Sequence, residues 1–323
     1  MTGGAGRRPP RIGAGRLAAL VALSATGVPA PVRAQGGARS ALVLELPASA
    51  RAVALAGAVG ALGGDDAALF HNPAQLATLP RRAAGLSVQR YLASSTLGAL
   101  AGGARLRAGV VALGVQTLSY GSVQELVPDP ASGGERGVPT GASVSAGELA
   151  VTAGYARSFG RFRAGLSGTA VHQRVAAASG SSVAAGVGLA WEPLPWATFG
   201  VAAQHLGHGV PLAGTRAPLP RTLRLGAAVH ALDRGPLALL VCGEVQQVVG
   251  DGARWAGGVE GSWQSPGRAR IVGRLGGVAG DAGAGDPLAF GGSLVVGGLA
   301  IDYAYRGFDA LGGTHRVGAR WLR

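Results

Sequence analysis

Alternation of apolar and polar residues with a period of two constrains this chain more than any other feature of its sequence. Residues 254–263 place Trp255, Val259 and Trp263 on one face of a strand, and Glu260 and Ser262 on the other. Residues 299–306 alternate in the same way. Because successive side chains on a strand point to opposite faces, such segments predict strands with one apolar and one polar face.

The alternation extends over most of the chain and predicts an all-β, transmembrane antiparallel β-barrel. We expect about fourteen strands, with boundaries uncertain by about three residues. They are expected near residues 82–91, 95–103, 106–119, 143–157, 160–174, 179–192, 195–207, 220–232, 235–249, 252–265, 267–279, 286–296, 297–307 and 313–323.

The connections between these strands point to the same class of protein. Those at 158–160, 192–195, 233–235 and 265–267 are short and contain Gly or Pro, whereas 120–142, 208–219, 280–285 and 308–312 are longer. Bacterial outer-membrane barrels alternate short periplasmic turns with longer outside loops. A soluble β-sandwich would also alternate, but it would pack large residues against a second sheet.

The first 34 residues predict a secretory signal peptide. Arg7, Arg8, Arg11 and Arg16 precede an apolar run at 17–28, and cleavage is expected after Ala34. The run is too short to cross a bilayer as a helix, which needs about 20 residues. We therefore expect export through the inner membrane and an outer-membrane location.

Composition and charge argue against several other classes. The net charge of +13 includes five arginines in the first 34 residues, so the mature chain carries +8 and no nucleic-acid partner is expected. Cys242 has no second cysteine to pair with and is expected to be a small apolar residue.

No catalytic constellation is recognisable, so we expect neither an enzyme nor a cofactor. The six histidines lie mostly at predicted strand ends, and no serine elbow accompanies them. His205 and His208 form an H-x-x-H pair without the third ligand and the frame that a metal site needs, so no metal is expected.

Residues 41–80 lack strand alternation and carry a distinctive motif. Its residues are Arg51, Gly57, Gly60, Asp65, Asp66, Asn72, Pro73, Ala74 and Leu76. This motif resembles the N-terminal signature of the PorV/PorQ family, within the FadL-like group of outer-membrane barrels. The chain departs from the family in having Gln75 where many members have Gly, and in ending on Arg323 rather than an aromatic residue.

The resemblance implies a fourteen-stranded barrel whose N-terminal segment folds into the lumen as a hatch. The expected organisation is a signal peptide at 1–34, a hatch at 35–80 and the barrel at 81–323.

The strand pattern also predicts a net positive lumen. The polar faces carry three acidic residues, Glu244, Glu260 and Asp302. The arginines could pair with the hatch and with solvent, or attract an anionic group such as a carboxylate. The expected lumen-lining arginines are Arg163, Arg224, Arg254, Arg268, Arg270, Arg274, Arg306, Arg316 and Arg320.

Three functions are compatible with these features. The first is a FadL-like channel for hydrophobic or amphipathic small molecules, with outer-membrane lipid and such a ligand as partners. The second is a PorV-like accessory subunit of type IX protein secretion that binds cargo or a translocon. The third is a purely structural barrel.

Overall fold

The computed structural model describes residues 39–267, 269–280, 286–308 and 312–323, which belong to one compact unit. The expected signal peptide and Arg268 lie outside the described residues.

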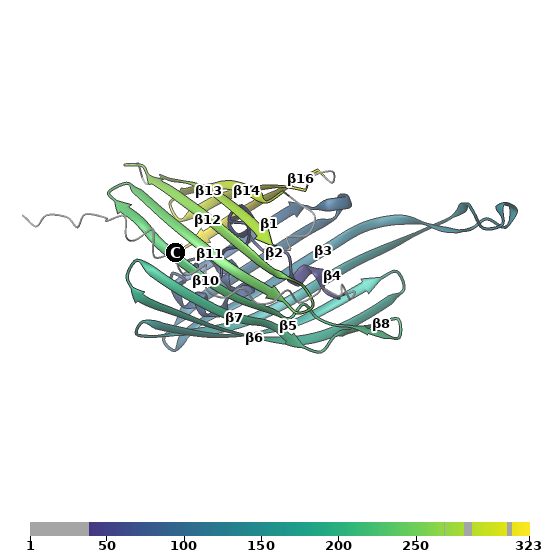
Figure 1. Ribbon diagram of the computed structural model, residues 1–323, viewed down its shortest axis with the longest axis horizontal. Coiled ribbons are helices and arrows are strands. Elements are labelled where there is room, and N and C mark those ends of the chain that lie inside the picture. Colours follow the sequence, from purple (N-terminus) through teal and green to yellow (C-terminus); the bar gives the residue numbers. More distant parts are fainter. Residues whose placement is uncertain (1–38, 268, 281–285, 309–311) are drawn as a thin grey trace, which may run out of the picture. The chain divides into compact units, whose positions relative to one another are not determined.

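The described residues form a closed antiparallel barrel of fourteen strands, which confirms the predicted fold class (Figure 1). Strands β1 and β16 close it, paired from Ala83↔Leu322 to Arg90↔His315. The barrel strands are β1 (Arg82–Arg90), β2 (Thr96–Leu106), β3 (Gly109–Pro128), β4 (Gly137–Phe159), β5 (Phe162–Val175), β6 (Ala178–Leu194), β7 (Ala197–Gly207), β10 (Thr222–Arg234), β11 (Leu237–Val248), β12 (Ala253–Gln264), β13 (Ala269–Gly280), β14 (Leu288–Val296), β15 (Leu299–Gly307) and β16 (Gly313–Leu322).

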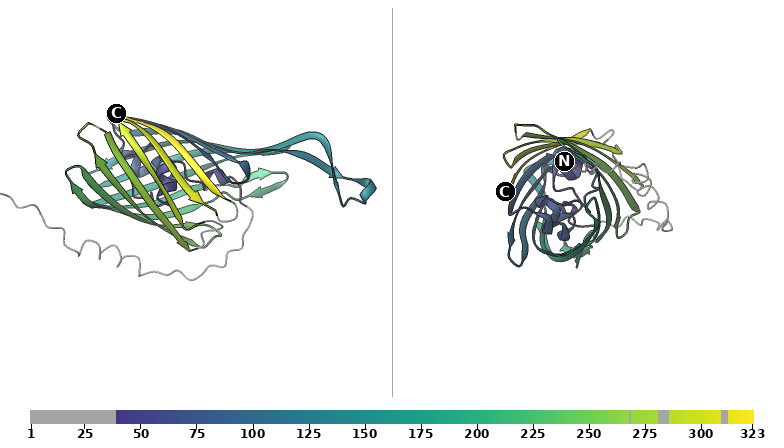
Figure 2. Two further views of the ribbon diagram at one scale, coloured as in Figure 1. Left: turned by 90° about the horizontal axis from the view of Figure 1, so that it is seen from above. Right: turned by 90° about the vertical axis from the view of Figure 1, so that its left-hand side faces the viewer.

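Two of the expected loops contain strands. The segment 120–142, expected to be a loop, is mostly a continuation of β3 and β4, which run on as a two-stranded ribbon beyond the other strands (Figures 1 and 2). Residues 208–219 contain the small hairpin β8 (Val210–Leu212) and β9 (Thr215–Ala217). The sequence analysis missed these extensions of β3 and β4. Both faces of the ribbon are exposed, so neither face is selected to be apolar and no alternation marks the strands.

The connections differ between the two ends of the barrel. At one end, here called the turn end, the strands are joined by two residues each at 107–108, 160–161, 195–196, 235–236 and 297–298. The opposite end, here called the loop end, carries the ribbon and the β8–β9 hairpin. The first residue of β1 and the last of β16 lie at the turn end.

Exposure alternates along the strands as a barrel with an apolar outer face requires. In β1, Leu86 and Val88 are 54% and 49% exposed, while Ser87 and Gln89 between them are buried. In β12, Val259 is 40% exposed. Ser262, of opposite parity, lines an internal cavity.

Short helices occupy the N-terminal segment and two of the loops. None of the helices in the described part of the chain is long and apolar enough to cross a bilayer. They are η1 (Leu42–Leu44), α2 (Ala50–Ala54), η2 (Asp66–Phe70), η3 (Pro73–Thr78), η4 (Leu92–Ser94) and η5 (Pro130–Ser132).

Candidate functional site

Residues 40–80, here called the inner segment, lie inside the barrel and are mostly buried (Figure 2). Their apolar side chains pack against small residues on the inward faces of the strands. Leu69 and Leu76 contact the cluster that contains Ala99 and Ala112, and Leu55 contacts the one that contains Ala228.

Glycines in the wall create the space that the inner segment fills. A Cβ at Gly165 would come within 3.0 Å of the backbone of Pro73 and Ala74, and one at Gly276 would collide with the backbone of Leu55 and Ala56. The close approach of two backbones therefore requires glycine at these positions.

Local sequence explains how the inner segment turns inside the lumen. Asn72 caps η3, accepting from the N–H of Ala74 at 3.1 Å, and Pro73 occupies the first helical position, where its missing N–H costs nothing. The Asn72 amide also donates to the carbonyl of Gly60 at 2.8 Å. After α2 the chain turns through two residues of positive φ, Ala56 at +53° and Gly57 at +91°, and glycine adopts such a conformation without strain.

A continuous chain of charges ties the inner segment to the wall. Arg51 makes two hydrogen bonds to Glu260, at 2.9 and 3.0 Å. Glu260 also accepts from Arg274 at 2.7 Å, and Arg274 lies 3.6 Å from Asp302. Arg320 bonds Asp302 at 2.6 and 2.8 Å and lies 3.8 Å from Asp65, back on the inner segment.

Two further groups hold the inner segment without belonging to that chain. Glu244 accepts from the N–H of Gly60 at 2.5 Å and from Arg224 at 2.6 Å. Arg316, with no exposed surface, donates to the carbonyls of Pro47 and Ala48 at 2.5 and 2.7 Å. Burying these groups is tolerable only because their hydrogen bonds are satisfied, so each contact fixes the segment in place.

The remaining expected arginines are distributed over both ends of the lumen. Arg254 donates to the carbonyl of Ala56 at 3.0 Å, and Arg306 lies over the ring of Phe308. Arg163 pairs with Glu192 at 2.8 Å. Many lumen arginines therefore meet carboxylates or carbonyls. Asp65 belongs to the segment with which the arginines were expected to pair, whereas Glu192 contributes negative charge that the sequence analysis did not place there.

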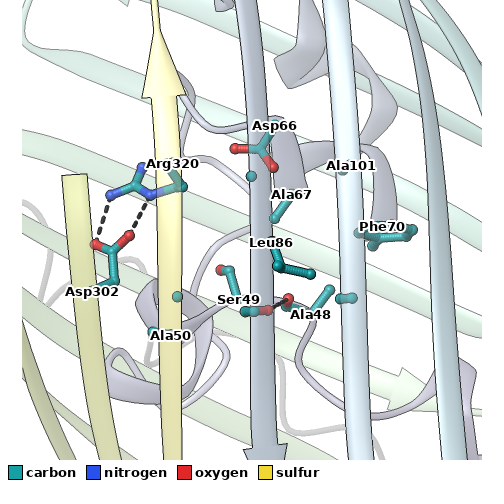
Figure 3. Close-up of a pocket in the computed structure, with 14 residues that line it drawn as sticks. Ala48, Ser49, Ala50, Asp66, Ala67, Phe70, Leu86, Ala101, Asp302 and Arg320 are labelled. Atoms are coloured by element: carbon teal, nitrogen blue, oxygen red, sulfur yellow. Dashed lines mark hydrogen bonds and ion pairs between the residues drawn. The ribbon is translucent and has the colours of Figure 1, made fainter. Parts of the chain in front are cut away.

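Asp66 differs from its neighbour Asp65. Burial, and then the Asp65 carboxylate, raise the pKa of Asp66 to about 8, and its Oδ1 has no hydrogen-bond partner. It borders a cavity of about 20 Å³ beside β1 and β16 (Figure 3). Among the residues drawn in Figure 3, Arg320 is joined to Asp302, and no dashed line reaches Asp66. That volume suits one water molecule.

A larger cavity, here called the chamber, lies beneath the inner segment toward the turn end. It has a volume of about 440 Å³. Leu62, Leu240 and Val272 supply apolar lining, and Arg163 and Arg270 supply charge. The buried Nε of Arg163 has no partner. Such a mixture of apolar walls and a few polar groups suits a small amphipathic molecule.

The histidines do not form a site. His205 is buried at a positive φ and its Nδ1 lies 3.0 Å from the carbonyl of Pro220, whereas His208 is exposed. Burial lowers the pKa of His71 to about 3, so its ring is neutral. Within the described residues, no three His, Cys, Asp or Glu side chains are grouped so as to hold a metal ion.

Sequence reasoning missed two residues that hold the inner segment. Glu148 accepts from the N–H of Val43 at 2.7 Å, and Arg105 donates to the carbonyls of Ala77 and Leu79. Glu148 was visible as an isolated acid in an apolar strand. Arg105 carried no such signal.

Comparison with solved structures finds the same fold in outer-membrane channels. A FadL homologue of Pseudomonas aeruginosa aligns with a TM-score of 0.54 and 11% identity, over 85% of this chain and 98% of that one. The Ralstonia pickettii toluene transporter TbuX aligns with a TM-score of 0.55 and 12% identity, over 86% and 99%. The Pseudomonas putida toluene transporter TodX gives 0.54 and 12%, over 85% and 97%.

The sequence itself matches no protein-family model and no curated protein. What this chain shares with the three channels is therefore the FadL-type barrel fold.

Proposed function

We propose that this protein is an outer-membrane channel for hydrophobic or amphipathic small molecules, with the inner segment as its hatch and the chamber on the path of the solute. The observation that carries the proposal is the combination of an apolar outer face with a lumen that holds both a fastened segment and the chamber. The toluene transporters TbuX and TodX, which share the fold, support it.

The outer face supports insertion in a membrane. Leu113, Leu189 and Ile301 are each about 60% exposed on three different strands. Large apolar side chains exposed around a whole barrel favour lipid over water as the surrounding medium.

Insertion is tested with two arginine substitutions on strand β12. Val259→Arg should impair folding into lipid vesicles, because a charge on the lipid face at mid-bilayer costs about 2–4 kcal/mol. Ser262→Arg points into the chamber and should fold like wild type. Equal folding yields by heat-modifiable gel mobility would contradict the proposed lipid face.

Transport is tested by solute uptake into vesicles that contain the folded protein. Toluene and a medium-chain fatty acid are suitable probes, since one is apolar and the other carries a carboxylate. We expect uptake of at least one above that of protein-free vesicles. A folded barrel that admits neither would contradict the channel and favour the purely structural role.

A PorV-like role in secretion is the second candidate, and the ribbon is the feature that favours it. Its strands expose Val123 and Leu126, at 65% and 59%, on a two-stranded element beyond the other strands (Figure 2). Exposed apolar residues on a projecting ribbon are suited to protein contacts. Replacing residues 121–143 by a tight turn should abolish secretion of cargo but leave solute uptake intact, if this role is the correct one.

A further inference from the structure

The seam between β1 and β16 brings two arginines together at the turn end. Arg82 and Arg323 exchange both backbone hydrogen bonds, Arg82 N–H to the Arg323 carbonyl at 2.8 Å and the reverse at 2.9 Å. Residues paired in this way lie directly opposite each other, with their side chains on the same face.

That face is the outward one. Side chains at alternate positions of a strand share a face. On β1, Arg82 shares the exposed face with Leu86 and Val88, and on β16, Arg323 shares it with Val317 and Trp321. Both arginines therefore lie at the edge of the apolar outer face. Trp321, which is 37% exposed, lies two residues before Arg323 on the same face. Aromatic side chains of membrane barrels are typical of the membrane interface.

The pair is electrostatically incomplete. Like charges directly opposite each other on a sheet are destabilising, and arginine does not lose its charge at accessible pH. In the part of the chain that the structure describes, neither arginine has an acidic side chain as a partner, and the α-carboxylate of Arg323 can offset only one of the positive charges. The neighbouring Arg81 is also exposed and adds a third positive charge.

The surrounding turn end is basic as well. Arg107, Arg157, Arg161 and Arg234 are exposed in its connections or on the last residues of its strands. Within the described residues, Asp233 and Glu192 are acids at the same end, and Glu192 is paired with Arg163. The loop end, by contrast, mixes both signs, with Glu125, Asp129 and Glu135 beside Arg136.

We propose that Arg82 and Arg323, with Arg81, form a binding site for the phosphate of an anionic phospholipid in the leaflet that surrounds the turn end. The proposal rests on the proposed membrane insertion. The phosphate bridges the two guanidinium groups, each of which can donate two parallel hydrogen bonds, and the acyl chains lie along Leu86 and Val317. Trp321 lies beside the glycerol region of such a lipid.

The site is tested by native mass spectrometry of the full chain, with phosphatidylglycerol and phosphatidylcholine as competing lipids. Wild type should retain phosphatidylglycerol preferentially. Arg82→Gln and Arg323→Gln should each lower that preference by about fivefold, the factor expected for one basic side chain near an anionic surface. Higher ionic strength should lower it in wild type too.

The matched control is Arg90→Gln with Arg174→Gln, two exposed arginines of the same outward parity at the loop end. This variant should keep the full preference. Folding of every variant into pure phosphatidylcholine vesicles is measured separately, so failure of insertion is distinguished from failure of lipid selection.

Three results would overturn the proposal. An unchanged preference in the Arg82→Gln, Arg323→Gln double variant would mean that these arginines do not bind the lipid, and would favour an acidic protein surface as their partner. An equal loss in the loop-end control would mean general electrostatic attraction. Displacement of the lipid by inorganic phosphate alone would identify a site for a soluble anion instead.

Discussion

Asp66 is a buried carboxyl that the fold keeps protonated. Burial raises its pKa to about 8, and the Asp65 carboxylate adds to that shift, while Arg320 opposes it. The folded protein therefore holds a proton on Asp66 that the unfolded chain releases above pH of about 4. The free energy of unfolding should fall as pH rises from that value to about 8, because the unfolded chain binds fewer protons there.

Asp66→Asn tests this directly. The amide is uncharged at every pH, so the variant should be more stable than wild type at pH 8 and should lose the decline between pH 5 and pH 8, measured by urea unfolding. Asp65→Asn is the control, because Arg320 and Arg51 hold the pKa of Asp65 low against its burial. That variant should be destabilised at pH 8. A wild-type decline that persists in Asp66→Asn would assign it to another group.

At the scale of elements, the inner segment can pack closely against the wall only where a strand has glycine on its inward face. Strand β13 contains two glycines that can be compared, one that touches the inner segment and one that does not. A Cβ at Gly276 meets the backbone of Leu55 and Ala56, whereas one at Gly273 meets nothing within 4 Å. Gly276→Ala should lower the free energy of unfolding by about 1–3 kcal/mol, the range for overpacking, and Gly273→Ala should not. Equal stability of the two variants in denaturant titrations would mean that the segment is loosely held.

The strands were predictable to within a few residues, because lipid outside and a packed lumen inside select opposite residue types at alternate positions. The ribbon of β3 and β4 was not, since water surrounds both faces there. In the lumen, alternation indicates that Arg274 and Arg316 point inward. Arg274 binds a carboxylate, and Arg316 binds the carbonyls of Pro47 and Ala48. These partners depend on how distant parts of the chain pack together, which no local sequence pattern encodes.

For the whole molecule, the ion pairs divide into those within the wall and those that cross to the inner segment. Arg274 and Arg320 keep Glu260 and Asp302 as partners even without the segment, and Arg224 keeps Glu244. These ion pairs therefore persist without the segment, whereas Arg316 and Arg254 lose the carbonyls of Pro47, Ala48 and Ala56. We expect the barrel to tolerate that loss because water that fills the lumen can solvate the two guanidinium groups.

Deleting residues 41–79 should consequently leave a folded barrel with raised conductance in planar bilayers, because the segment that fills the lumen is removed and barrel diameter grows with the number of strands, here fourteen in the described residues. Arg51→Gln is a milder variant, which removes one end of the charge chain and should give brief openings rather than a steady current. Shortening the ribbon at 121–143 is the control, since it lies outside the lumen and should leave conductance unchanged. If the deletion folds, as judged by heat-modifiable mobility, and conducts no more than wild type, then side chains of the wall close the lumen. In that case the inner segment stabilises the barrel rather than gating it.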